Sequence, residues 1–149
     1  MAERWPDLTG RFENATHVLA VRVYHEDTDF TGVVYHATYL KFCERGRSDC
    51  LRLLGIHHDE LHGRSSDGRL GFVVRRMRCD FHRPARIADK LEVHTRLTGL
   101  SGARLTVDQT VARGDERLFE AEVILALIDE RGRPRRIPAA ISAALRVRA

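Results

Sequence analysis

Residues 24–47 read YHEDTDFTGVVYHATYLKFCERGR and join a loop to the only long helical pattern in the chain. The loop is acidic and contains a glycine: it carries Glu26, Asp27, Asp29 and Gly32. Acidic side chains are favoured near the positive end of a helix dipole, and unpaired backbone N–H groups there can stabilise developing negative charge. The stretch therefore predicts a reactive site at a helix start, and we expect Asp29 to be its central carboxylate.

The helical pattern runs from about residue 35 to residue 54. The residues that recur at steps of three and four positions are Leu40, Cys43, Arg47, Cys50 or Leu51, and Leu54. Gly55 follows directly and is predicted to end the helix as its C′ cap. Gly46 lies inside the helix, where a glycine costs about 0.8–1 kcal/mol relative to alanine, and a close contact there would compensate.

Alternation of apolar and polar residues predicts strands at 16–24, 70–83, 91–98, 104–111 and 119–127. In the second of these runs, the alternation places Val73, Met77, Cys79 and Phe81 on one face. Short turns separate the last four runs, so neighbouring strands are expected to pair antiparallel. We expect residues 1–15 to form a loosely docked lead-in and residues 55–69 a surface loop.

These elements predict one α+β domain spanning residues 1–149, in which an antiparallel sheet wraps around one long central helix. A sheet that is covered by only one helix per chain leaves apolar surface uncovered. We therefore expect a homo-oligomer.

The composition narrows the class of protein. The chain has 149 residues and three cysteines without CxxC spacing, which suits buried reduced thiols. It shows no apolar run long enough to span a membrane and no signal peptide, so a cytoplasmic location is expected. Lys and Arg exceed Asp and Glu by 25 to 21, a net charge of +4. This excess is compatible with nucleic acid, an anionic membrane surface or a phosphate-bearing ligand, and by itself selects none of them.

The pattern Y-H-E-D-T-D-x-x-G-V-V-Y-H-x-x-Y-L-x-F-x-E-R-G-R at residues 24–47 resembles the signature of the 4-hydroxybenzoyl-CoA thioesterase family. It is similar in particular to the Tol–Pal-associated (YbgC-like) acyl-CoA thioesterases. The likeness continues through FVVRRMRCDFHRPARIADKLEV at 72–93 and through 119–138, and so covers nearly the whole chain. The resemblance implies a hotdog fold, a homodimer or homotetramer with active sites at subunit interfaces, and hydrolysis of acyl-CoA to a carboxylic acid and CoA.

The resemblance also implies roles for individual residues. The second Asp of D-T-D, Asp29, corresponds to the catalytic carboxylate, and the His of V-V-Y-H, His36, to a second functional residue. A thiolate is a good leaving group because its conjugate acid has a pKa near 8.5, so one carboxylate acting as general base or nucleophile is enough. Backbone N–H groups around Tyr35 and His36 would bind the oxyanion, with Gly32 shaping the loop through a positive φ or a close approach. No metal or other cofactor is required.

Three arginines in the second block of the resemblance, Arg75, Arg83 and Arg86, are candidates for binding CoA phosphates, although solvated strand or turn positions explain them as well. His58 and His62 have the i,i+4 spacing of metal ligands, but we interpret their segment as a solvated loop. Glu44 and Arg47 match the family's E-R-x-R, and an i,i+3 helix pair would explain them equally well.

Two alternatives remain beside catalysis. The first is a non-catalytic module that binds acyl-CoA or acyl carrier protein on the same fold, although binding alone needs neither Asp29 nor His36. The second, nucleic-acid binding, rests only on the basic charge and is not expected. The sequence departs from the common family pattern at Phe30 and Thr31, and either could line the acyl channel.

Overall fold

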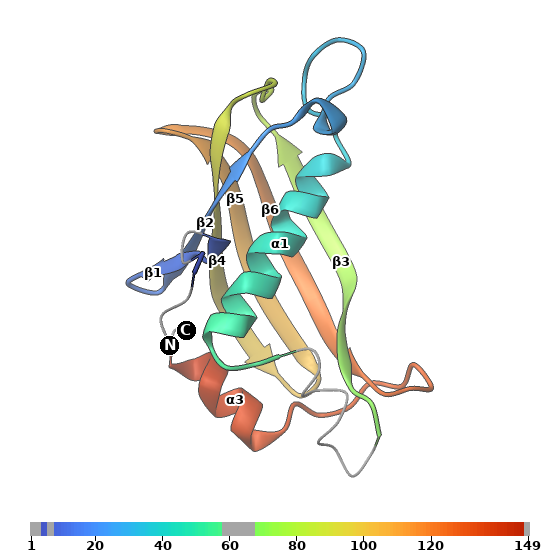
Figure 1. The fold of residues 1–149 in the computed structure, drawn as a ribbon. Coiled ribbons are helices and arrows are strands. Elements are labelled where there is room, and N and C mark those ends of the chain that lie inside the picture. Colours follow the sequence, from blue (N-terminus) through green and yellow to red (C-terminus); the bar gives the residue numbers. More distant parts are fainter. Residues whose placement is uncertain (1–3, 6–7, 58–67, 148–149) are drawn as a thin grey trace.

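The computed structural model describes residues 4–5, 8–57 and 68–147. Its strands are β1 (Arg11–Glu13), β2 (Thr16–Arg22), β3 (Gly71–Phe81), β4 (Lys90–Ser101), β5 (Arg104–Arg113) and β6 (Glu116–Ile128). Its helices are the 3-10 turn η2 (His25–Asp27), α1 (Thr38–Leu53) and α3 (Ala139–Arg146). The described strands form one antiparallel sheet in the order β1-β2-β4-β5-β6-β3, which curves around α1 (Figure 1). The predicted α+β hotdog fold is confirmed.

Helix α1 begins three residues later than the pattern suggested. The N–H of Tyr35 donates to the carbonyl of Asp27 (2.9 Å), and the N–H of Thr38 donates to the carbonyl of Tyr35 (2.8 Å). Residues 35–37 therefore form a turn that leads into the helix. The other end follows the prediction: Gly55 has φ +81°, and the N–H groups of Gly55 and Ile56 cap the last carbonyls in a Schellman motif.

The buried face of α1 packs on the concave face of the sheet. Phe42, Cys43 and Cys50 lie at most 1% exposed, over strand residues such as Val93 and Phe119, which are fully buried. Burial raises the pKa of both thiols to about 12, so they remain protonated and unreactive at neutral pH. These two cysteines are structural, as predicted.

Gly46 is where α1 comes closest to the sheet. A Cβ atom at this position would lie 2.7 Å from a methyl carbon of Val93 and 3.0 Å from the hydroxyl of Thr95. The amide of Gln109 fills the same space, donating to the Cys43 carbonyl and to the Thr95 hydroxyl, both at 2.8 Å. The contact expected to compensate for the glycine is therefore present.

We expect Gly46→Ala to lower the free energy of unfolding by about 1–2 kcal/mol, which urea denaturation would measure. Overpacking a tight site costs about 1–3 kcal/mol, whereas the better helix propensity of alanine returns at most about 1 kcal/mol. Arg45→Ala, on the exposed side of the same helix, is the control and should change stability by less than about 0.5 kcal/mol. A Gly46→Ala protein more stable than wild type would contradict the close packing.

Arg47 is buried at 9% exposure and donates to the side-chain oxygen of Gln109 (2.9 Å), while Glu44 accepts from the hydroxyl of Ser48 (2.8 Å). The alternative of an i,i+3 ion pair between Glu44 and Arg47 is therefore wrong. Arg47 instead links the helix to the middle of the sheet.

Strand β3 contains a bulge that the alternation did not predict. The register with β6 shifts between Val74 and Arg76, so Val74 lies opposite Leu125 while Met77 lies opposite Val123. Leu125 and Val123 both belong to the core beneath α1. Because residues paired across strands point to the same face of a sheet, Val74 and Met77 both face α1. Val73 therefore points away from α1, and its predicted place beside Met77, Cys79 and Phe81 is wrong. One extra residue exchanges the two faces of the strand.

The chain's two ends contain structure that the alternation did not reveal. Strand β1 pairs with β2 inside the predicted lead-in, and α3 packs Ile141, Ala144 and Leu145 against the core. Their i,i+3,i+4 spacing was a helix signal in the sequence. Among the described residues, no helix is long and apolar enough to cross a membrane.

Candidate active site

The predicted site is built on a tight hairpin between η2 and α1, which projects from one end of the molecule in Figure 1. Thr28 and Val34 form an antiparallel bridge, and the N–H of Asp29 donates to the carbonyl of Val33 (2.9 Å). The turn closes where the N–H of Gly32 donates to the carbonyl of Asp29 (3.0 Å), with Gly32 at φ +84°. Asp29 is thereby fixed at the first position of the turn by its own backbone.

The base of this hairpin is held by Asp27, which is 7% exposed. Its carboxylate accepts from the N–H of Tyr24 (2.8 Å), and its carbonyl accepts from the N–H of Tyr35. Asp27 therefore has the structural role that its type favours in turns.

The Asp29 carboxylate is held mainly by Thr31. Its Oδ1 atom accepts from the backbone N–H of Thr31 (2.8 Å) and from the Thr31 hydroxyl (2.5 Å). The hydroxyl bond, followed by the backbone bond, lowers the pKa of Asp29 below its ordinary value. Asp29 is therefore an ionised carboxylate at neutral pH, and both bonds from Thr31 go to Oδ1, leaving Oδ2 without a bond from that residue.

His36 lies in the same hairpin and forms no hydrogen bond or ion pair with Asp29. Because Asp29 is paired with Val33, three further residues of chain place the two Cα atoms no more than about 16 Å apart. The His36 ring packs against Tyr35 (centroids 4.4 Å apart) and edge-on to Phe81 at the end of β3 (6.4 Å). The structure thus places His36 in an aromatic cluster beside the hairpin.

The expected oxyanion donors need a correction. The N–H groups of Tyr35 and Gly32 already donate to the carbonyls of Asp27 and Asp29, so neither can receive an oxyanion in this conformation. The N–H of His36, just before α1, donates to no acceptor among the described residues. Of the two N–H groups expected at the helix start, that of His36 is therefore the one without an acceptor among the described residues. The positive φ expected of Gly32 is confirmed, and its close approach is not, since a Cβ there would meet no atom within 4 Å.

The connection between β3 and β4 supports the hairpin from the side. Val33 forms a bridge with Arg86, and the N–H of Val34 donates to the carbonyl of Ala85 (2.8 Å). The N–H of Ala85 in turn donates to the hydroxyl of Tyr39, which is 3% exposed and stacks on Phe119 with ring centroids 5.1 Å apart. The core thus fixes the segment against which the hairpin rests.

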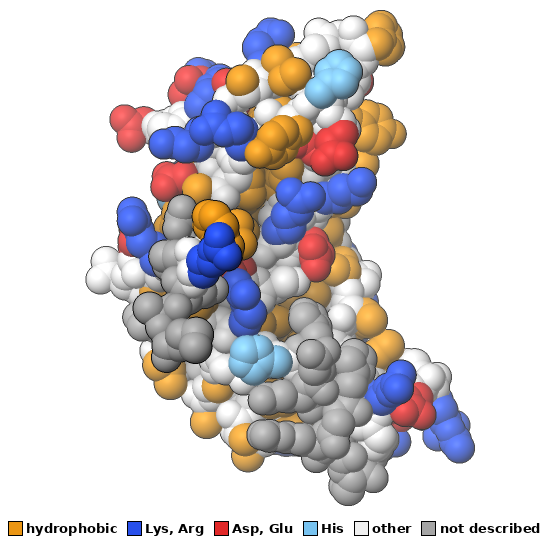
Figure 2. Space-filling model, viewed as in Figure 1, with side chains coloured by type: hydrophobic (Ala, Val, Ile, Leu, Met, Phe, Trp, Pro, Cys, Tyr) orange, Lys and Arg blue, Asp and Glu red, His pale blue; other side chains and the backbone are white. Residues whose placement is uncertain are grey.

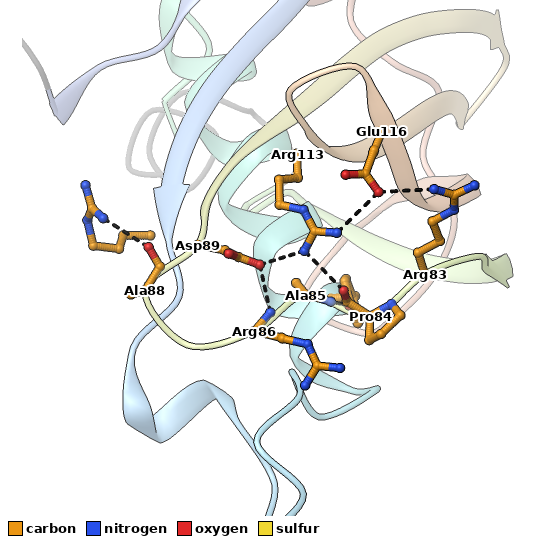
Figure 3. A network of polar contacts seen from close by, with 10 residues as sticks. Arg83, Pro84, Ala85, Arg86, Ala88, Asp89, Arg113 and Glu116 are labelled. Atoms are coloured by element: carbon orange, nitrogen blue, oxygen red, sulfur yellow. Dashed lines mark hydrogen bonds and ion pairs between the residues drawn. The ribbon is translucent and has the colours of Figure 1, made fainter.

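Ion pairs hold this connection from its outer side (Figure 3). Arg113 donates to Asp89 (2.8 Å) and to Glu116 (3.3 Å), and Glu116 also accepts from Arg83 (3.2 Å). Asp89 accepts from the backbone N–H of Arg86 (2.9 Å). These contacts order the turn that carries the candidate phosphate ligands.

The three arginines predicted to bind CoA phosphates do not lie together. Arg86 is exposed beside the hairpin, and its guanidinium has no ion-pair partner among the described residues. Arg83 is engaged with Glu116. Arg75 lies at the bulge of β3, six residues and about 20 Å of extended strand from Phe81, and lines a separate hollow of about 670 Å³. Of the three arginines, Arg86 is the one that the bridge to Val33 places beside the hairpin of Asp29.

Two residues that support the site were not identified as such from the sequence. Tyr39 holds Ala85 across 46 residues of sequence, a contact that no local pattern indicates. Thr31 was noted only as a departure from the family pattern, although Asp-x-Thr is a local spacing at which a hydroxyl can reach the carboxylate.

No cluster of three or more His, Cys, Asp or Glu side chains that could hold a metal ion occurs among the described residues. His58 and His62 lie outside them.

A sequence profile of the thioesterase superfamily matches residues 31–120. The acyl-CoA thioester hydrolase YbgC of Escherichia coli is 41% identical over 83% of this chain and 90% of its own length. An acyl-acyl carrier protein thioesterase of Arabidopsis thaliana is 31% identical over 89% of this chain and 68% of its own. The crystal structure of a probable thioesterase from Bartonella henselae superposes with a TM-score of 0.80 at 47% identity, covering 83% of this chain and 99% of that one.

Proposed function

Because the chain belongs to the thioesterase superfamily and is a thioester hydrolase, we propose that it cleaves acyl-CoA to a carboxylic acid and CoA, with Asp29 as the catalytic carboxylate. The observation that carries the assignment of Asp29 is its state in the hairpin. Its carboxylate is ionised, is fixed by Thr31 through one oxygen, and lies in the hairpin that precedes α1. The shared core of the described residues supports a single thioesterase domain.

The ionised carboxylate can act in two ways. As a nucleophile, Oδ2 attacks the thioester carbonyl, the tetrahedral intermediate expels the thiolate, and water then cleaves the acyl anhydride of Asp29. As a general base, Asp29 takes a proton from water, the resulting hydroxide attacks the carbonyl, and the thiolate departs and takes up a proton. In both routes the leaving thiolate needs little protonation, because its conjugate acid has a pKa of about 8.5.

The helix start supplies the second element of the mechanism. The backbone N–H of His36 lies at the positive end of the α1 dipole and would donate to the oxyanion of the intermediate. One such donor typically contributes about 2.7–4 kcal/mol to lowering the barrier. The His36 ring, held by Tyr35 and Phe81, would contact the substrate or orient the water.

The CoA nucleotide carries phosphates, for which Arg86 is the best placed of the three predicted arginines. Its guanidinium lies outside the ion-pair network that holds Arg83. Arg83 would have to leave Glu116 to bind a phosphate. Arg75 would reach a substrate only from a second copy of the chain.

The open setting of the site supports a homo-oligomer. Phe30 is fully exposed, and Tyr35 and Phe81 are about half exposed. Figure 2 shows hydrophobic side chains on the same upper part of the molecule. Strand β3 is one of the two edges of the sheet, and no described strand pairs with its outer side. A second copy that paired there would cover this edge and enclose the acyl group.

We expect wild-type protein to show at least twice the chain mass of 17.0 kDa in size-exclusion chromatography with light scattering. Val74→Glu, which places a charge on the half-exposed helix-facing side of β3, should shift the population towards the monomer. Thr98→Glu, on an exposed position of the interior strand β4, is the control. A wild-type protein of 17.0 kDa at assay concentration would refute the assembly.

The test of the function is thiol release, followed with a thiol-reactive dye, from short-chain, long-chain and aromatic acyl-CoA esters and from an acyl carrier protein thioester. Turnover of an acyl-CoA ester is the expected result. Tight acyl-CoA binding without release would favour the non-catalytic binding module instead. If the carrier-protein ester were turned over preferentially, the leaving group would be the carrier protein and not CoA, and the reaction would still be thioester hydrolysis.

A further inference from the structure

Thr31 is the residue whose side chain holds the Asp29 carboxylate. Its backbone N–H and its hydroxyl both donate to the same oxygen, Oδ1, at 2.8 and 2.5 Å. Thr31 itself is exposed on the hairpin turn. Thr31 is one of the two positions at which the sequence departs from the common family pattern. The family motif therefore assigns no role to its hydroxyl.

We propose that Thr31 is a positioning residue, whose hydroxyl binds Oδ1 so that Oδ2 of Asp29 is the oxygen that attacks the thioester or takes the proton from water. The inference rests on the proposed catalytic role of Asp29.

The hairpin explains why such a hydroxyl is useful. The backbone of Asp29 is fixed by its pairing with Val33 and Gly32, but the carboxylate could still rotate about two side-chain bonds. Asp29 is only partly buried, so packing does not restrict this rotation. Two donors on Oδ1 select one orientation, and hydrogen bonds to an ionised acceptor are about twice as strong as neutral ones. Oδ2, which receives no bond from Thr31, is then the reactive atom.

Orientation rather than ionisation is what the hydroxyl contributes. The carboxyl of an aspartate titrates near pH 3.9 without help, so Asp29 would be ionised at neutral pH even if Thr31 lacked a hydroxyl. By lowering the pKa of Asp29, the bond also makes the carboxylate a slightly weaker base. A side chain that acted by making Asp29 a stronger base would raise its pKa. A side chain that fixes the orientation of Asp29 can lower that pKa and still accelerate the reaction.

The experiment compares Thr31→Val with Thr31→Ser. Valine keeps the β-branched shape and the backbone N–H and removes only the hydroxyl, whereas serine keeps the hydroxyl. We expect Thr31→Val to lower kcat by roughly 10- to 100-fold with little change in KM, as misplacement of a reacting group does. The acid limb of its kcat/KM profile should move to higher pH, and Thr31→Ser should restore both properties.

The pH profile is measured from the loss of thioester absorbance, a signal that can be recorded at acidic pH. An unmoved limb in Thr31→Val would show that the hydroxyl does not bind the carboxylate in solution, and an unchanged kcat would show that it does not position Oδ2; either result would overturn the inference. Melting temperatures of all variants would show whether the exposed loop substitution alters the fold.

Asp29→Asn separates the two proposals: if Asp29→Asn retains activity, the assignment of Asp29 fails. If Asp29→Asn is inactive and Thr31→Val matches wild type, only the role of Thr31 fails.

Discussion

Replacing Asp29 with Asn should lower kcat for acyl-CoA hydrolysis by at least about a hundredfold, the range expected for loss of a catalytic base. Asparagine has the shape of aspartate and can still accept the two bonds from Thr31 at its amide oxygen. It lacks the negative charge, so it can neither take a proton from water nor form an anhydride with the acyl group. The substitution therefore removes the chemistry and leaves the hairpin in place.

The matched control is Glu26→Gln, which neutralises an exposed carboxylate of the same loop. Its activity should stay within about twofold of wild type, because exposed pairs of charges interact weakly across solvent. Both variants should be measured with the substrate that wild type turns over fastest, at saturating concentration, so that the ratio reports kcat. If Asp29→Asn and Glu26→Gln were equally active, another group would have to be the catalytic carboxylate.

Removing Asp49 should have the largest effect on stability, a loss of about 3 kcal/mol in the free energy of unfolding. Asp49 lies on α1 at 7% exposure and accepts from the Nε2 atom of His17 (2.7 Å) and the N–H of Gly10 (2.8 Å). Arg52 donates to its other oxygen. Asp49→Ala would leave the fully buried His17 and the Gly10 N–H without acceptors, and the N-terminal segment would lose its attachment to α1.

Arg52→Ala is the matched control, because it removes a partner of the same carboxylate from the solvent side. The Arg52 side chain is half exposed, so this loss should cost less than about 1 kcal/mol. Urea denaturation of the two variants gives the comparison. A cost for Asp49→Ala as small as that for Arg52→Ala would show that the buried contacts contribute little.

The same cluster should make the protein less stable in acid. Burial lowers the pKa of His17 below its ordinary value of 6.5, although Asp49 acts in the opposite direction. The folded chain therefore takes up this proton less readily than the unfolded chain, and the stability present above about pH 6.5 is lost as the pH falls. Protonation would also place an N–H on Nδ1, which is buried without a hydrogen-bond partner.

Asp49 acts in the same direction at lower pH. Burial raises its pKa, but the bonds from Arg52, Gly10 and His17 together bring it below the ordinary value, so its contribution is lost below about pH 3.9. We expect unfolding free energies measured between about pH 7.5 and 5.5 to fall, and to fall less steeply in His17→Phe. An equal slope in both proteins would assign the acid sensitivity to other groups.

The local features of this protein were determined by the sequence alone. The loop-to-helix motif, the C′ cap at Gly55 and the positive φ of Gly32 depend on neighbours within a few residues, and all are present in the structure. The strands followed from period-two alternation, and the antiparallel pairs β4–β5 and β5–β6 from the short turns between them. The pairing expected between β3 and β4 is wrong, because β3 crosses over to pair with β6. The resemblance of residues 24–47 to thioesterases indicated the family.

Contacts between distant residues were decided only by the tertiary structure. The bulge at Val74 exchanged the faces of β3, because side-chain direction depends on counting residues and one extra residue inverts the count. His17 meets Asp49 across 32 residues, and Tyr39 meets Ala85 across 46, so both pairs depend on how α1 lies on the sheet. The sequence also could not show which backbone N–H at the helix start is unpaired, because the bond from the N–H of Tyr35 to the carbonyl of Asp27 is visible only in the structure. Residue types and short spacings fix local geometry, whereas the partners of each buried polar group depend on strand register and packing.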